Sequence, residues 1–426
     1  MKSGIGRRGR RTAPFDGLTW RRVSSVGTVL AVLTIVPVGL APSAVADDVQ
    51  SKQWYLEPMQ AEKMWKVSTG KGIKVAVIDS GVNSSTPSLK GQVLEGVDLT
   101  DKAGGATDDY DGQGTTTAEL IAGTGNGGGL QGLAPGAKII PIRLPLLQHD
   151  EVPQVNDPLG KAIKAAADSD AQIIDISLGN QYAIGLDIAG QGEALEYAVK
   201  KGKLLIAGTG DNAKKGNKPQ YPAAFTEVLG VASSDQDGKV ADFSQHGDDV
   251  DITAPVVGIP RWCDANFQSY CDDGSGATAA AAIASASAAL IWSAHPDWTA
   301  NQVTRVLFDT AGRDWKKGTV STYLGNGLLR PRLALAKSTI NPGAADENPL
   351  TDGYPSKSDG KASPAASATA SSQSQKSSSG GGTAAAAEDS NSSDDNTQLW
   401  VVLGAVAAVG VIGGGAFAVL RTRRSG

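Results

Sequence analysis

The chain has 426 residues, which is enough for one large domain or two ordinary ones. Its net charge is −5, but basic residues gather at both ends, and residues 47–420 carry 29 basic against 43 acidic side chains, a net charge of −14. The strong negative charge of residues 47–420 argues against nucleic acid or an anionic lipid surface as the partner.

The first 46 residues have the pattern of a secretion signal. Seven Lys and Arg residues accompany an apolar run from Val26 to Leu40, and Ala44-Val45-Ala46 forms a small-x-small cleavage site. We expect residues 1–46 to be a signal peptide, with an uncleaved anchor as the alternative. The following domain would then lie outside the cytoplasm.

The next segment predicts a strap, a short helix and a first strand. Residues 53–65 (QWYLEPMQAEKMW) suit the strap and an amphipathic helix, and Ile73–Ile78 is a β-branched apolar run that ends in Asp79. Open α/β sheets place functional groups at the carboxyl ends of their strands. Asp79 is therefore a candidate catalytic residue, although Asp-Ser-Gly alone also suits an ordinary turn.

Strands and helices then alternate up to residue 336. This order predicts a mostly parallel sheet covered on both faces, an α/β fold of three layers. The expected strands are 137–144, 172–178, 203–207, 228–232 and 250–253, and the expected helices are 113–123, 159–167, 193–201, 278–293 and 299–310, with a capping element over 324–336.

Two cysteines, Cys263 and Cys271, occur in this expected extracytoplasmic domain. A disulfide between them is the natural reading in an oxidising compartment, because no other metal ligands cluster nearby. We expect no cofactor; a structural calcium ion cannot be read from the pattern.

The composition changes after residue 341, where the folded domain (47–341) is expected to end. Residues 342–397 are rich in Ser, Ala, Gly, Lys and Asp and predict a disordered linker. We expect residues 398–420 to be a membrane helix: they are uncharged, and the 22 apolar residues from Leu399 to Leu420 would span roughly 33 Å as a helix, enough to cross a bilayer. The basic tail, 421–426, would be cytoplasmic, which makes the chain a single-pass protein of the cell membrane.

The most informative stretch is Gly274–Ile283 (GSGATAAAAI), a glycine-rich turn that leads into an alanine-rich helix. Many hydrolases present a nucleophilic hydroxyl at such a turn, where the helix N-terminus can stabilise an oxyanion. Thr278 is the hydroxyl residue at this position.

Five ordered motifs resemble the subtilisin-like serine protease family over residues 53–336. VAVIDSG resembles the strand of the catalytic Asp and places that role on Asp79. DGQGT resembles the segment of the catalytic His, IAGTGD the oxyanion segment, and GSGATAAAA the nucleophile helix. SLG, residues Ser177, Leu178 and Gly179, resembles the substrate-binding strand. The strap, stalk and membrane helix resemble the mycosins, membrane-anchored subtilases of actinobacterial type VII secretion systems.

The differences from the family lie at the residues that would carry out catalysis. The resemblance implies His where the chain has Gln113, Ser where it has Thr278, and the oxyanion Asn where it has Asp211. A glutamine amide cannot accept a proton near neutral pH, and a carboxylate repels an oxyanion. These substitutions predict an inactive peptidase, with an active serine-type endopeptidase as the alternative.

The related sedolisins use a Glu in place of the His and an Asp at the oxyanion position, which makes Glu119 an alternative candidate for the missing base. Six residues separate Glu119 from Gln113, so the helix turns by about 600° between them and the two side chains face opposite ways. The three histidines, His149, His246 and His295, lie in other segments. We therefore expect a binding or scaffold protein of the type VII secretion membrane complex. The cleft of its folded domain could hold a peptide by strand addition.

Overall fold

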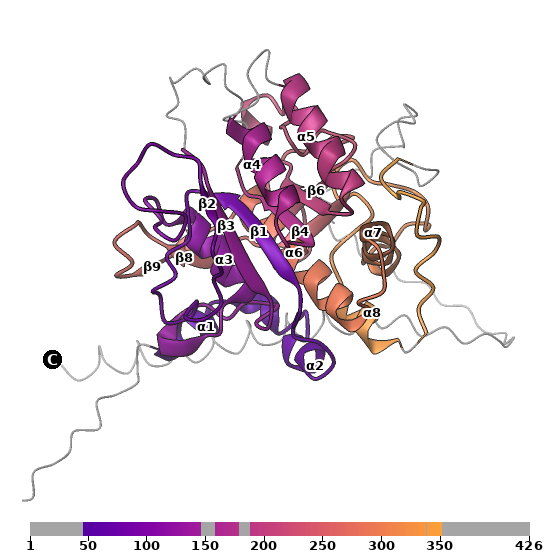
Figure 1. Ribbon diagram of the computed structural model, residues 1–426. Helices are drawn as coiled ribbons and strands as arrows, with labels where there is room; N and C mark the ends of the chain where they lie inside the picture. The colour runs from indigo at the N-terminus through magenta and orange to yellow at the C-terminus, as the bar shows by residue number, and fades with distance from the viewer. Residues whose placement is uncertain (1–45, 146–157, 179–187, 338, 352–426) are drawn as a thin grey trace, which may run out of the picture. The chain divides into compact units, whose positions relative to one another are not determined.

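The computed structural model describes residues 46–145, 158–178, 188–337 and 339–351 (Figure 1). Most of the expected signal peptide (1–45), most of the linker and the expected membrane helix lie outside these residues. Within the described part, one helix, Ala277–Ala294, is long and apolar enough to span a membrane, but it is largely buried in the protein.

A seven-stranded sheet with the order β2-β3-β1-β4-β5-β6-β7 forms the centre of the fold. Every pairing in it is parallel. The expected α/β fold is thereby confirmed. The strands are β1 (Lys74–Asp79), β2 (Val97–Asp98), β3 (Lys138–Arg143), β4 (Ile173–Ile176), β5 (Leu204–Gly208), β6 (Leu229–Ser234) and β7 (Ile252–Pro255).

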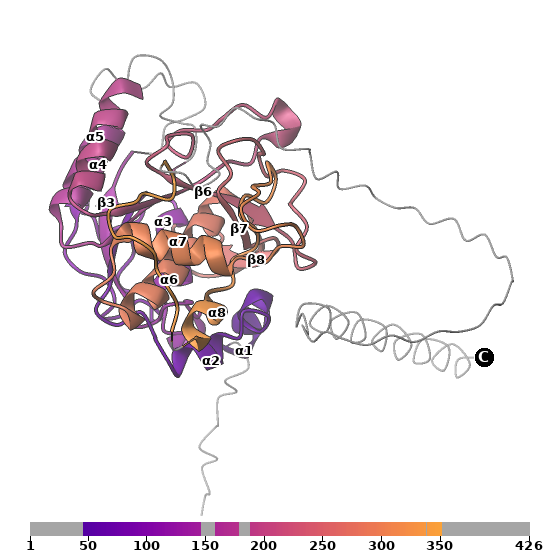
Figure 2. The same ribbon diagram turned by 90° about the vertical axis from the view of Figure 1, so that its right-hand side faces the viewer.

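Successive residues of each strand face opposite sides of the sheet, and two hydrophobic cores result. On β1, Val75 and Val77 join one core, whereas Ala76 and Ile78 join the other. Figures 1 and 2 show α4 and α5 lying together on the second face, and α3, α6, α7 and α8 on the first. The helices are α1 (Ala46–Ser51), α2 (Ala61–Trp65), α3 (Gln113–Ala122), α4 (Pro158–Asp168), α5 (Ile188–Lys200), α6 (Ala277–Ala294), α7 (Ala300–Thr310) and α8 (Pro331–Ala336).

Helix α6 runs through the middle of the first core. It packs against five strands, β1 and β4 to β7, and against α3. Its alanines are buried from Ala279 to Ala289, because only small side chains let a helix lie this close to so many neighbours. The same packing fixes the position of Thr278 at its first turn.

The N-terminal strap packs back on the domain, as the sequence predicts. The side chain of Tyr55 is fully buried, and burial raises its pKa. The indoles of Trp54 and Trp65 donate to the carbonyls of Val257 and Leu133. The strap is thus part of the core and not a loose extension.

Three differences from the expected elements concern the cleft wall and the end of the domain. A two-stranded antiparallel hairpin, β8 (Ile259–Trp262) and β9 (Tyr270–Gly274), was not expected, because its polar, cysteine-containing sequence lacks a clear alternation. Within 324–336 only α8 is helical. Packing also continues past residue 341, the expected domain end, because Leu350 is buried in the first core and Glu347 pairs with Arg305 at 2.9 Å.

Candidate active site

A cleft of about 430 Å³ lies where α3, α6 and the β8–β9 hairpin meet. Three of the predicted catalytic and oxyanion positions, Gln113, Asp211 and Thr278, line it. A larger and more apolar hollow of about 540 Å³ lies between the N-terminal strap and the segment after α7, and it holds none of the predicted residues. The smaller cleft is therefore the candidate site.

Gln113 lines this cleft and contacts Asp79, which does not line it. Asp79 is fully buried, and its Oδ1 accepts hydrogen bonds from Ser80 N at 2.7 Å and from Gln113 Nε2 at 3.1 Å. Burial raises the pKa of Asp79 well above its ordinary value; the bond from Ser80 opposes this rise, and the charge of Asp109 adds to it. The contact that the resemblance implies between positions 79 and 113 is thus present, but with an amide in place of an imidazole.

The amide of Gln113 is held from two sides. Besides Asp79, its Nε2 donates to the carbonyl oxygen of Ser177 at 2.9 Å. An amide nitrogen has two protons, and both are used by these acceptors. Gln113 thus bridges the Asp79 carboxyl and the Ser177 backbone, and it offers no group that could take a proton from a nucleophile.

Two features of the chain bring Gln113 to this place. A Cβ on Gly114 would lie 2.1 Å from the carbonyl oxygen of Gly81, so only glycine lets α3 begin this close to β1. Asp109 fixes the preceding turn, since its oxygens accept hydrogen bonds from the backbone of Gly112 and Thr115 and from the Ser80 hydroxyl. This role of Asp109 was not predicted from the sequence.

Thr278 and Asp211 meet at the start of α6. Thr278 is half-buried, and among the residues that the structure describes its hydroxyl has no hydrogen-bond partner. Asp211 Oδ1 accepts the backbone N–H of Ala277 at 2.9 Å. A Cβ on Gly276 would lie 2.6 Å from Asp211 Oδ2, so this glycine is what lets the carboxyl reach the helix.

The Asp211 carboxyl therefore sits where a hydrolase would stabilise an oxyanion. Free N–H groups and the positive end of the dipole at a helix N-terminus attract negative charge. In this chain one of those N–H groups, that of Ala277, donates its hydrogen bond to the Asp211 carboxyl. Although the side chain remains exposed, partial desolvation raises its pKa, and the bond from Ala277 opposes the rise.

Asp175 is a second buried carboxyl that sequence reasoning missed. It lies on β4 and accepts hydrogen bonds from the hydroxyls of Ser177 and, at 2.7 Å, of Ser285 on α6. Burial raises its pKa to about 6, against the effect of these two bonds. A carboxylate inside the apolar run QIIDISL was the available signal. Asp175 ties α6 to the sheet.

Glu119 points away from the reacting positions. Its carboxyl accepts hydrogen bonds from Thr86 Oγ1 at 2.8 Å and from the Tyr270 hydroxyl at 2.7 Å, and it does not line the cleft. The described histidines also lie elsewhere: His246 stacks on Tyr323, and His295 stacks on Trp298. None of these groups offers a general base to Thr278.

Ser177 and Leu178, the expected substrate-binding residues, follow β4 and are buried. Gly179 lies outside the described residues. The Ser177 carbonyl accepts a hydrogen bond from Gln113.

Within 46–145, 158–178, 188–337 and 339–351, no group of three or more His, Cys, Asp or Glu side chains is placed to hold a metal ion.

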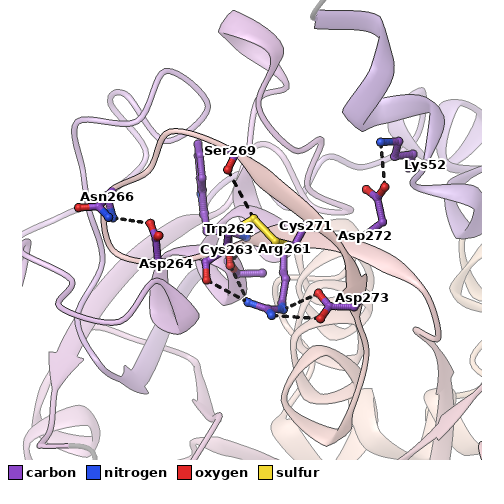
Figure 3. The surroundings of a disulfide bond; sticks show 11 residues. Lys52, Arg261, Trp262, Cys263, Asp264, Asn266, Ser269, Cys271, Asp272 and Asp273 are labelled. Carbon is purple, nitrogen blue, oxygen red and sulfur yellow. Dashed lines mark hydrogen bonds and ion pairs between the residues drawn. A yellow bond between two sulfur atoms is a disulfide. The ribbon is translucent and has the colours of Figure 1, made fainter.

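The β8–β9 hairpin forms one wall of the cleft. Cys263 and Cys271 are joined by a disulfide with a sequence separation of 8 residues (Figure 3). On the same hairpin Arg261 pairs with Asp273 at 3.1 Å, and Asp272 pairs with Lys52 of the segment that follows α1. Trp262 stacks on Tyr270 with 3.8 Å between the ring centroids.

Comparisons with known proteins agree with this architecture. The subtilase family model matches residues 70–327. Thermitase of Thermoactinomyces vulgaris is 30% identical over 275 residues, 64% of this chain and 95% of that protein. The major intracellular serine protease of Bacillus subtilis is 33% identical over 219 residues, 50% of this chain and 67% of that protein.

Solved structures give the same fold. MycP1 from Mycobacterium smegmatis aligns with a TM-score of 0.58 and 26% identity, over 69% of this chain and 86% of that chain. The MycP3 protease from the type VII (ESX-3) secretion system aligns with a TM-score of 0.56 and 28% identity, over 66% and 87%. A chain in the periplasmic assembly of the ESX-5 inner membrane complex aligns with a TM-score of 0.56 and 28% identity, over 69% and 86%. Because the family model covers more than half of the sequence and the fold agrees, the chain belongs to the subtilase family.

Proposed function

We propose that this subtilase is a catalytically inactive member of its family that serves as a scaffold or binding module. The proposal rests on the hydrogen bonds made at two positions of the site, Gln113 and Asp211. The Gln113 amide donates hydrogen bonds to both Asp79 and the Ser177 carbonyl. The Asp211 carboxyl accepts a hydrogen bond from the backbone N–H of Ala277 at the start of α6.

The expected loss of catalytic rate from these substitutions supports inactivity. Loss of the general base from a Ser-His-Asp triad lowers kcat by about a million-fold. Loss of one oxyanion donor raises the barrier by about 3–4 kcal/mol, and a carboxylate in its place adds repulsion. Thr278 then has neither a base to take its proton nor a site to stabilise the intermediate.

A peptidase assay tests this proposal. Full-length chain, purified in detergent, is incubated with a mixed peptide library from pH 3 to pH 9, beside the Thr278→Ala variant. We expect the same background from both proteins at every pH. Cleavage by the parent chain that disappears in Thr278→Ala would establish the second candidate, an active serine-type endopeptidase, which the protease relatives favour.

We propose a type VII secretion membrane complex as the partner. The support comes from the structural relatives, which include MycP1, MycP3 and a chain in the ESX-5 inner membrane complex. The uncharged apolar segment 398–420 would anchor the chain in the cell membrane, with the folded domain on the extracytoplasmic side. A scaffold role needs the fold and the anchor, and it does not need a working triad.

Affinity purification from native membranes tests the partner. The tagged full-length chain should co-purify with the type VII membrane components, and the Thr278→Ala variant should do so equally well. Purification without them would contradict the assignment. Equal recovery with both proteins would also show that assembly does not depend on the hydroxyl at position 278.

A further inference from the structure

The charges of the folded domain are unevenly distributed, although residues 47–420 carry 29 basic against 43 acidic side chains. Lysines gather at the end of the domain where the strands of the sheet begin, on segments 63–72, 90–91 and 134–138. We call this surface the lysine face. These three segments contain no Asp or Glu. Their five lysines are Lys63, Lys66, Lys71, Lys90 and Lys138.

Contacts between the three segments make the lysine face one continuous surface. The backbone N–H of Gly136 donates to the carbonyl oxygen of Thr69 at 2.7 Å, and a Cβ on Gly136 would lie 3.1 Å from Lys71 N. The ammonium of Lys138, the first residue of β3, donates to the carbonyl oxygen of Gly91 at 2.6 Å. Figure 1 shows α2, at the start of the first segment, beside the beginning of β1.

The positive charge of this face is not balanced by ion pairs. Four of the five lysines are exposed, and among the residues that the structure describes none of the five forms a salt bridge. By contrast, the adjacent Lys74 pairs with Asp170 at 2.9 Å. Glu62 precedes the face in the chain, and Asp297 follows the end of α6. Five lysines against these two carboxylates still leave a net charge of +3.

An exposed valine lies among the lysines. Val67 follows α2 and is 59% exposed, the largest exposed fraction among the large hydrophobic side chains that the structure describes. Lys66 precedes it directly, and Lys71 follows four residues later. A bilayer surface suits this combination, because cations meet the headgroup phosphates while an apolar side chain enters the boundary of the acyl chains.

The acidic remainder of the domain does not prevent such a contact. Exposed charges are screened over about 8 Å at physiological ionic strength, so lysines that touch a surface act more strongly than carboxylates farther away. The charge balance of the whole chain, which argues against an anionic lipid partner, thus hides a local exception. Beyond residue 351 the expected linker has 46 residues, and a flexible chain of this length has an r.m.s. span of roughly 35–40 Å. The expected membrane helix would therefore keep the domain within reach of the bilayer.

We infer that the lysine face docks the folded domain on a bilayer surface that carries anionic phospholipid headgroups. Helix α6 connects this face to the cleft: Thr278 at its first turn lines the cleft, and the Ser293 hydroxyl at its last turn donates to the carbonyl oxygen of Lys71 at 2.7 Å. Its 18 residues separate the two by about 27 Å. Docking therefore leaves the cleft directed away from the membrane. The inference goes beyond the proposed function and takes from it only the membrane anchor.

Lysine acylation in lipid nanodiscs tests the inference. The full-length chain is reconstituted in discs of phosphatidylcholine alone or of phosphatidylcholine with phosphatidylglycerol. It is then treated briefly with an amine-reactive ester, and mass spectrometry measures the modification of each lysine. We expect Lys66 and Lys71 to react at least about fivefold more slowly in the anionic discs, since each lysine near an anionic surface adds about fivefold to the docking equilibrium. Lys215, an exposed lysine near Asp211 at the cleft end, should react equally in both.

Charge reversal provides the matched variants. Lys66→Glu combined with Lys71→Glu should weaken docking by at least about 25-fold, so the other three lysines of the face should lose their protection in anionic discs. Lys214→Glu combined with Lys215→Glu changes the net charge equally and should keep that protection. Thermal melts by circular dichroism verify that both variants are folded.

The outcomes separate the inference from the proposed function. Equal modification of the lysine face in the two kinds of disc, or equal protection in the two double variants, would overturn the inference. Protection that is present in native membranes but absent from anionic discs would also overturn it, and would indicate an acidic protein partner. Incorporation of the chain into the neutral discs reports separately on the proposed membrane anchor.

Discussion

Replacement of Glu119 by Gln should change how stability depends on pH. The pKa of Glu119 is raised from 4.5 in the unfolded chain to about 7 in the folded domain, because burial disfavours its charged form. Between these two values the folded state holds a proton that the unfolded state releases. The contribution of Glu119 to stability is therefore greatest below about pH 4.5, falls as the pH rises towards 7, and is level above it.

The size of the effect follows from the two pKa values. At about 1.36 kcal/mol per pH unit, a rise from 4.5 to about 7 corresponds to about 3 kcal/mol of lost stability at pH 8. Glu119→Gln keeps the shape of the neutral acid and should be as stable as the parent chain near pH 4.5 and more stable at pH 8.

Urea unfolding of the full-length chain, followed by tryptophan fluorescence from pH 4.5 to 8.5, measures the difference. Asp175, whose pKa is raised to about 6, acts with the same sign in both proteins. The difference between the two curves therefore isolates Glu119. Glu62→Gln, at an exposed position of α2, controls for the loss of one charge. Parallel curves for the wild type and Glu119→Gln would refute the reasoning.

Three further substitutions test the account of the site. Gly114→Ala should lower stability in urea by about 1–3 kcal/mol, because its Cβ would meet the Gly81 carbonyl oxygen, whereas Gly105→Ala, which has open space, should change it by less than about 0.5 kcal/mol. Asp211→Asn should reduce stability by less than about 1 kcal/mol at pH 7, since a neutral acceptor still caps α6, and peptide assays should detect no hydrolysis because the base is still missing. Replacing both Cys263 and Cys271 by Ala should lower the free energy of unfolding by about 2–3 kcal/mol, and an unchanged value would show that the disulfide adds nothing to the fold.

Most of the fold could be predicted because its strands are short apolar runs. Ile73–Ile78 and 172–178 gave β1 and β4 to within a few residues, since buried parallel strands need continuous β-branched and apolar residues. The β8–β9 hairpin could not be found in this way, because its stability comes from a disulfide and from contacts with α3 rather than from an alternating pattern.

The positions of the candidate site are a prediction from sequence motifs, whereas its contacts come from the structure. Ordered motifs identified Asp79, Gln113, Asp211 and Thr278, and the family resemblance placed them together. The capping of Ala277 by Asp211 joins residues 66 apart, and the Tyr270–Glu119 hydrogen bond joins residues 151 apart. Neither pairing has a local sequence signal, so both depended on the folded structure.

The claim that the nucleophile position has no functioning base is tested most directly by covalent labelling. A fluorophosphonate reacts with an activated hydroxyl, and intact-mass spectrometry of the full-length chain detects one adduct. We predict no adduct on the wild type between pH 5 and 9, and an adduct at position 278 when Gln113→His, Thr278→Ser and Asp211→Asn are combined. An adduct on the wild type that is lost in Thr278→Ala would contradict the account.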